Sequence, residues 1–191
     1  MHPFPVIVGL WLAFVVCWIA LAAWSNKTEK RAGLGSELPY RIVLIIGGLV
    51  FLVPAHGYYG PMRRWLVTRE EAWICIGLIA LGFAFSGWAR VYLGPLWSGT
   101  VTKKTDHRIV DTGPYGIVRH PIYTGILLAV YATAAAKGTI LGLDGAILIT
   151  IGIWMKARLE ERWLRAELGT DAYGAYCRKV SMLIPFGPKS A

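Results

Sequence analysis

Five consecutive residues combine a cation, an imidazole and a phenol where an apolar stretch begins: Arg119-His120-Pro121-Ile122-Tyr123. Pro121 suits the first turn of a helix, because the N–H group that proline lacks would have no partner there. His120 would then be the N-cap residue, and Tyr123 would follow about one turn later on the same face. The free N–H groups and partial positive charge of a helix N-terminus bind carboxylates and phosphates. The segment is therefore a candidate binding site for an anionic group.

Two consecutive acids, Glu160 and Glu161, follow the last apolar stretch and stand near Lys156 and Arg158. Both candidate groups also have a simpler explanation. Histidine, tyrosine and arginine commonly anchor helix ends at a membrane interface. Paired acids are typical of a solvated helix beside a membrane, with contacts such as Glu161–Arg165. Taken one at a time, the two patterns favour these simpler explanations.

Several other kinds of site find no support in the sequence. The His, Cys, Asp and Glu residues lack metal-ligand spacing, so no metal site is expected. No glycine-rich phosphate loop follows a strand, and no nucleophile elbow is present. The three cysteines, Cys17, Cys75 and Cys177, are an odd number without paired spacing, which argues against a disulfide framework. The net charge of +9 lies between long apolar stretches, which indicates membrane loops and membrane lipids rather than nucleic acid as partners.

Composition places the chain in a membrane. Of its 191 residues, 55% are hydrophobic and 16% are charged, whereas a soluble domain carries about 25% charged residues. We therefore expect a single all-α integral membrane domain, residues 1–191, with three spans in residues 1–93. Residues 94–191 would then hold a catalytic loop, a helical hairpin and a C-terminal cap. The sequence leaves the oligomeric state open.

Five uncharged stretches are candidate membrane spans: Val6–Trp24, Ile42–Tyr59, Ala72–Ala89, Ile122–Ala136 and about Thr139–Met155. The first is about 28 Å long as a helix, enough to cross a hydrocarbon core of roughly 30 Å. No positive segment precedes it, so we expect a retained anchor and not a signal peptide. The last two stretches flank the tight Lys137-Gly138 connection, which predicts a helical hairpin. We expect five spans, or four if this hairpin is re-entrant.

The positive charges predict the orientation of these spans. With five spans, 16 of the 20 basic residues lie in the first loop, the third loop and the C-terminal tail. Only Arg63, Arg64, Arg69 and Lys137 lie on the opposite side. Because lysine and arginine are enriched in cytoplasmic loops, the third loop and the tail are predicted to be cytoplasmic. Both candidate groups belong to that side. The charged helix from Lys156 to about Leu168 is predicted to stop at Gly169.

The candidate groups also belong to a longer ordered series of motifs. In chain order these are His107-Arg108-Ile109-Val110, Gly113-Pro114-Tyr115, Arg119 to Tyr123, Glu160-Glu161, Leu168-Gly169, Tyr173, Tyr176 and Leu183-Ile184-Pro185. In this order, the stretch from about Lys103 to Phe186 resembles the isoprenylcysteine carboxyl methyltransferase family of integral membrane enzymes. Its relatives, the phospholipid N-methyltransferases, are similar. The first 90 residues match only as generic spans.

The resemblance implies that S-adenosylmethionine binds in a cytoplasmic pocket between the third loop, the hairpin and the C-terminal segment. The implied cofactor residues are His107, Ile109, Val110, Tyr115, His120, Pro121, Ile122, Tyr123 and Glu160. Among these, His120 and Tyr123 are the candidate catalytic residues. The substrate-contacting arginine of the family is replaced by Lys156, with Arg158 nearby, which removes a bidentate grip on a carboxylate. Tyr115, Tyr123 or Trp97 could hold a sulfonium through their aromatic faces.

We therefore expect carboxyl O-methylation of an isoprenylcysteine-like or other lipidic, amphipathic acceptor. Three alternatives stay open. The first is a phospholipid or amine N-methyltransferase, for which His120 or a nearby glutamate would act as the base. The second is an NADPH-dependent reductase of the related sterol-reductase group, which the lack of a phosphate-binding arginine cluster disfavours. The third is a non-catalytic, lipid-binding membrane protein with the same scaffold.

Overall fold

The computed structural model describes residues 3–24, 28–31, 33–53, 65–97, 102–104 and 109–189. Its helices are α1 (Pro3–Ala22), α2 (Leu34–Leu52), α3 (Arg69–Leu93), α4 (Pro114–Ile117), α5 (Pro121–Lys137), α6 (Ile140–Leu168) and α7 (Thr170–Lys179). A short 3-10 helix, η1 (Gly94–Leu96), follows α3, and strands β1 (Thr28–Arg31) and β2 (Thr102–Lys104) form an antiparallel pair. The expected all-α membrane fold is confirmed. The small sheet was not predicted.

Among the residues that the structure describes, four helices are long and apolar enough to cross a membrane: α1, α2, α3 with η1, and α6. Helix α5 has 17 residues and is shorter than these four. The count of five spans therefore stays a prediction. The second apolar helix begins at Leu34, before the expected Ile42, and the last one runs from Ile140 to the predicted stop at Gly169.

The predicted hairpin between α5 and α6 is confirmed. Gly138 ends α5 with a left-handed backbone, φ +64°, which favours glycine. A Cβ atom there would also lie 2.6 Å from the Trp65 carbonyl oxygen. The Thr139 hydroxyl then accepts a hydrogen bond from the Gly142 N–H at 3.1 Å and caps α6. This turn sends α6 back along α5 toward the opposite end of the molecule.

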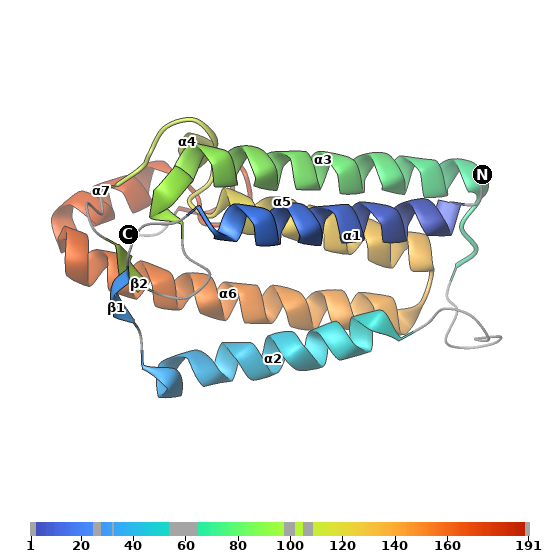
Figure 1. Ribbon diagram of the computed structural model, residues 1–191, viewed down its shortest axis with the longest axis horizontal. Coiled ribbons are helices and arrows are strands. Elements are labelled where there is room, and N and C mark those ends of the chain that lie inside the picture. Colours follow the sequence, from blue (N-terminus) through green and yellow to red (C-terminus); the bar gives the residue numbers. More distant parts are fainter. Residues whose placement is uncertain are drawn as a thin grey trace.

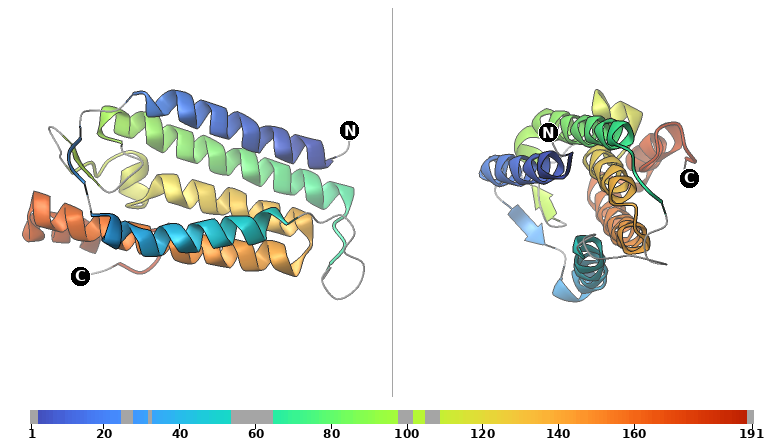
Figure 2. Two further views of the ribbon diagram at one scale, coloured as in Figure 1. Left: turned by 60° about the horizontal axis from the view of Figure 1, so that its bottom comes forward. Right: turned by 90° about the vertical axis from the view of Figure 1, so that its right-hand side faces the viewer.

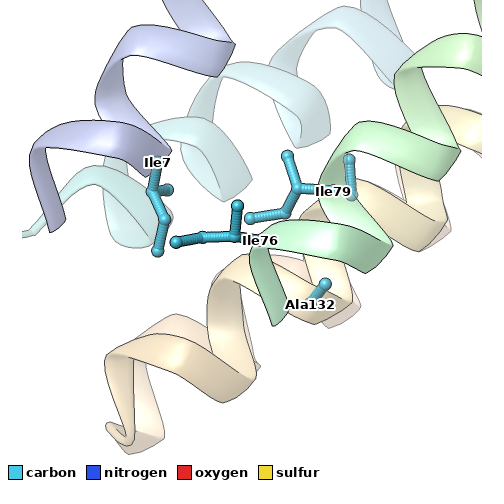
Figure 3. Packing of buried hydrophobic residues seen from close by; sticks show 5 residues of the cluster. Ile7, Ile76, Ile79 and Ala132 are labelled. Carbon is cyan, nitrogen blue, oxygen red and sulfur yellow. The ribbon is translucent and has the colours of Figure 1, made fainter. Parts of the chain in front are cut away.

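The long helices pack in a row. Figure 2 shows α5 between α3 and α6, with α1 beside α3 and α2 beside α6, in agreement with the packing contacts. Helices α3 and α5 approach closely because Gly125 faces Gly82: a Cβ atom on Gly125 would lie 2.3 Å from the Gly82 carbonyl oxygen. A core cluster from α1, α3 and α5 adjoins this contact through Ala129, and Figure 3 shows its members Ile7, Ile76 and Ala132.

One end of the bundle gathers segments that are far apart in the sequence. Figure 1 shows α4, α7, both strands and the C-terminus at the end where α5 begins. The N-terminus lies at the opposite end. Strands β1 and β2, which belong to the first and third loops, therefore lie at the same end as α7 in the tail. Both candidate groups of the sequence lie there.

Arg90 joins α1, α3 and η1 at this end. Its side chain is fully buried, and its guanidinium donates hydrogen bonds to the Gly94 carbonyl (2.8 Å), the Trp24 carbonyl (2.7 Å) and the Leu21 carbonyl. It also lies 4.5 Å from the centre of the Trp97 ring. A cation is favourable here because the C-terminus of α1 carries partial negative charge.

We expect Arg90→Met to lower the free energy of unfolding by at least about 3 kcal/mol, because it removes the hydrogen bonds of a charged group and each contributes about 1.5–3 kcal/mol. Thermal unfolding in detergent measures this loss. Arg162→Met, at an exposed position of α6, is the control. Equal melting temperatures for the two variants would contradict a structural role for Arg90.

Candidate active site

A buried ion pair joins the two candidate groups. The Arg119 Nε atom donates to the Glu161 Oε1 atom at 2.7 Å, and both side chains are almost fully buried. The same guanidinium donates to the carbonyl oxygens of Cys177 (3.1 Å) and Val180. Burial by itself lowers the pKa of Arg119, but the hydrogen bond and negative charge of Glu161 raise it above its ordinary value. Arg119 therefore stays charged and ties α5, α6 and the C-terminal segment together.

His120 lies between the two consecutive glutamates. Its Nε2 atom is 3.3 Å from Glu161 Oε1, and its Nδ1 atom is 3.5 Å from Glu160 Oε2. The imidazole also stacks on the Tyr123 ring at a centroid distance of 5.5 Å. His120 is the N-cap residue of α5, as predicted, but its side chain makes no cap hydrogen bond. Its ring nitrogens instead lie near the carboxylates of Glu160 and Glu161 on α6.

Glu160 contacts side chains from both α5 and its own helix. The Tyr123 hydroxyl donates to its Oε1 atom at 2.7 Å, and the Lys156 ammonium lies 3.9 Å from the same oxygen. That ammonium lies 5.4 Å from the centre of the Tyr123 ring and 5.9 Å from the centre of the Tyr40 ring. Tyr40 belongs to α2, so three helices supply side chains here. The interpretation of both glutamates as solvated residues is wrong.

The C-terminal segment closes one side of this group through its backbone. The N–H group of Arg119 donates to the Ser181 carbonyl at 2.8 Å, and the N–H group of His120 donates to the Met182 carbonyl at 3.1 Å. The Thr124 hydroxyl donates to the Leu183 carbonyl at 2.6 Å. The sequence predicted that free N–H groups at the start of α5 bind an anion. The backbone N–H of His120 is not such a group, because it already donates to the Met182 carbonyl.

An aromatic and aliphatic cluster adjoins the charged residues. Tyr115 and Ile122 pack together, with Val110, Trp97 and Tyr123 partly buried against them. The Tyr176 hydroxyl of α7 donates to the backbone carbonyl of Tyr115 at 2.7 Å and holds α4 in place. Burial raises the pKa of Tyr176, so its hydroxyl stays protonated as this donor. Ile109 packs in a neighbouring cluster with α7 residues.

The structure brings most of the predicted site residues together at the start of α5. These are Val110, Tyr115, His120, Pro121, Ile122, Tyr123, Lys156 and Glu160. Ile109 lies beside them, and His107 is outside the described residues. Arg158 does not join the group: it is exposed, with its guanidinium 5.4 Å from the centre of the Trp154 ring.

Two features of the site were missed from the sequence. Arg119 and Glu161 belong to the two candidate groups, but the sequence did not predict that they pair with each other. Tyr40 has no signal in the sequence, because it stands near the start of an apolar helix far from every motif. The full arrangement places two carboxylates, an imidazole and an ammonium beside aromatic rings with little exposure to solvent. Such a site can bind a charged small molecule and orient it against a second reactant.

Comparison with known proteins identifies the matching family. A family model described as phospholipid methyltransferase matches residues 71–171, just over half of the chain. Methanethiol S-methyltransferase 2 of Bradyrhizobium diazoefficiens is 45% identical over 138 residues, which cover 65% of this chain and 51% of the relative. Methanethiol S-methyltransferase 1 of that organism is 43% identical over 140 residues, covering 66% and 47%.

A third relative is named for a different acceptor. The protein-S-isoprenylcysteine O-methyltransferase of Schizosaccharomyces pombe is 30% identical over 119 residues, which cover 59% of this chain and 49% of the relative. The chain spans about half the length of these curated relatives. The family-model match begins in the first turn of α3 and continues past the end of α6, so it includes α5 and the paired glutamates. The chain therefore belongs to the phospholipid methyltransferase family.

Proposed function

We propose that the protein is an integral membrane methyltransferase that uses S-adenosylmethionine at a site on the cytoplasmic side. The observation that carries the proposal is the convergence of His120, Tyr123 and Glu160, which come from α5 and α6. The distribution of basic residues supports the cytoplasmic side. Family membership supports methyl transfer.

The residues present fit the proposed methyl donor. S-adenosylmethionine supplies a methyl group attached to a positively charged sulfur atom. The face of Tyr115, which packs with Ile122 at the start of α5, attracts such a cation. Glu160 adds a carboxylate, held in place by the hydrogen bond from Tyr123. The C-terminal segment at Ser181 and Met182 covers the start of α5 and would limit access of water.

A thiol and a carboxylate are the two candidate methyl acceptors. The relatives named methanethiol S-methyltransferase are 43% and 45% identical over about two thirds of this chain, which favours a thiol acceptor. A carboxylate of an amphipathic, lipidic acceptor is the second candidate, supported by the S. pombe relative. A carboxylate is ionised at neutral pH, whereas a thiol has a pKa of about 8.5 and must lose a proton. We assign His120 as the base that accepts it.

The chain would accelerate the reaction mainly by orientation. Side chains from α5 and α6 would bind the methyl donor. The Lys156 ammonium lies near two of them, Glu160 and Tyr123, and is the candidate contact for the acceptor. Holding two reactants in line and out of water contributes several kcal/mol, up to about 7–11 kcal/mol in favourable cases. A site at the membrane edge also lets an apolar acceptor arrive from the bilayer.

Calorimetry of the detergent-purified protein with S-adenosylmethionine, and separately with NADPH, tests the proposal. We expect micromolar binding of S-adenosylmethionine alone. A screen with radiolabelled methyl donor against alkanethiols, prenylcysteines and phospholipids then identifies the acceptor class. Binding of NADPH alone would make the protein a reductase, and binding of neither would leave a lipid-binding scaffold.

A further inference from the structure

The ammonium of Lys156 occupies a cation site that the protein itself provides. It lies 5.4 Å from the centre of the Tyr123 ring, 5.9 Å from the centre of the Tyr40 ring and 3.9 Å from Glu160 Oε1. Its side chain is only 15% exposed. Two aromatic faces and one carboxylate are the groups that bind an organic ammonium ion. Here a side chain of the protein places its own ammonium among them.

Tyr40 is held firmly in this position. It is 4% exposed and packs against Leu159, Leu44 and Met155, which belong to α2 and α6. Its helix, α2, lies outside the segment that matches the family model. The contact of Tyr40 with Lys156 is therefore a feature of this chain that the matched segment does not contain.

We propose that Lys156, positioned by Tyr40, determines the charge of the methyl acceptor, so that the site accepts thiolates or carboxylates and rejects amines. The inference rests on the proposed methyltransferase function and adds the acceptor class. In this proposal Lys156 contacts the acceptor, and Tyr40 is a positioning residue that acts through Lys156.

The charge balance of the reaction supports this selection. Once a thiol has lost its proton to His120, methyl transfer breaks the donor S–CH₃ bond and forms a new S–CH₃ bond. The positive charge of the donor and the negative charge of the thiolate then both disappear. Transfer to a neutral amine keeps the positive charge but moves it from the donor sulfur to the acceptor nitrogen, the atom that we propose lies beside Lys156. Next to Lys156 this charge is destabilised, because like charges repel strongly where water is largely excluded.

Matched acceptors test the inference. Butanethiol and butylamine share an alkyl chain and differ in the reacting group. For purified wild type and the variants Lys156→Gln, Tyr40→Leu and Tyr40→Phe, we would measure butanethiol affinity by calorimetry without donor, methyl transfer to both compounds, and affinity for S-adenosylmethionine. Arg162→Gln removes an exposed positive charge from the same helix and is the control.

We expect wild type to methylate butanethiol and not butylamine. Lys156→Gln should weaken butanethiol binding and raise its KM by about tenfold or more, because a charge contact in a buried site is lost. Tyr40→Leu should raise that KM about fivefold, and Tyr40→Phe should restore most of the loss because the ring remains. Affinity for S-adenosylmethionine should change much less in each variant, which also reports that the site has folded.

Several results would overturn the inference while leaving the proposed function intact. These are methylation of butylamine by wild type, an unchanged butanethiol KM in Lys156→Gln, and donor binding without transfer to butanethiol. Equal losses in Tyr40→Leu and Tyr40→Phe would overturn the role of Tyr40. Failure of wild type to bind S-adenosylmethionine would instead overturn the proposed function.

Discussion

Replacing Arg119 with alanine is expected to destabilise the protein by about 4 kcal/mol, because a buried charge that loses its partner costs about 3–5 kcal/mol. The variant leaves the almost fully buried Glu161 carboxylate without its guanidinium and removes the hydrogen bonds to the carbonyls of Cys177 and Val180. The C-terminal segment then loses one of its side-chain attachments to the start of α5 and keeps the hydrogen bond from the Thr124 hydroxyl to the Leu183 carbonyl. Chemical denaturation in detergent measures the loss in the free energy of unfolding.

Two further variants separate charge from packing. Arg178→Ala removes an exposed arginine from α7 and should leave stability within about 0.5 kcal/mol of wild type. The double variant Arg119→Met, Glu161→Leu replaces the ion pair with apolar side chains and should recover most of the lost stability. It should not recover donor binding, because His120 loses one of its two carboxylate neighbours. A double variant as unstable as Arg119→Ala would contradict this account of the pair.

Glu160→Gln should lower the affinity for S-adenosylmethionine by about 100-fold. The Glu160 carboxylate and the positively charged donor would form a charge pair with little water around it, and removing one charge of such a pair costs about 2–5 kcal/mol of binding free energy. The amide keeps the size of the side chain and an oxygen that can accept the 2.7 Å hydrogen bond from Tyr123. Stability should therefore change little. Calorimetric titration measures the affinity, and a melting curve checks the fold.

Asp171→Asn, at an exposed position in the first turn of α7, is the matched control and should bind the donor like wild type. A Glu160→Gln variant with unchanged affinity would show that Glu160 is not part of the donor site. A loss of affinity accompanied by a lower melting temperature would assign Glu160 a structural role instead.

Local features of the sequence were enough to predict the long helices, the hairpin at Gly138 and the N-cap position of His120. Each depends on neighbours within a few residues: uncharged stretches long enough for a membrane, a left-handed glycine, and a proline in a first turn. Helical spacing also explains why Lys156 belongs to the site and Arg158 does not. Lys156 and Glu160 are four residues apart and share a face, whereas Arg158 is rotated by roughly 200° from Lys156.

The site itself was determined by tertiary packing. Which carboxylate is buried depends on the face of α6 that packs against α5, so Glu161 pairs with Arg119 and not with Arg165 one turn away on its own helix. Tyr40 reaches Lys156 only because α2 packs along α6. Hydropathy and helix capping depend on residues close together in the sequence, so both can be predicted from it. The partner of a buried charge depends on segments that meet only after folding. A charge removed from water is stable only beside an opposite charge, so the packing of the helices selects the partner.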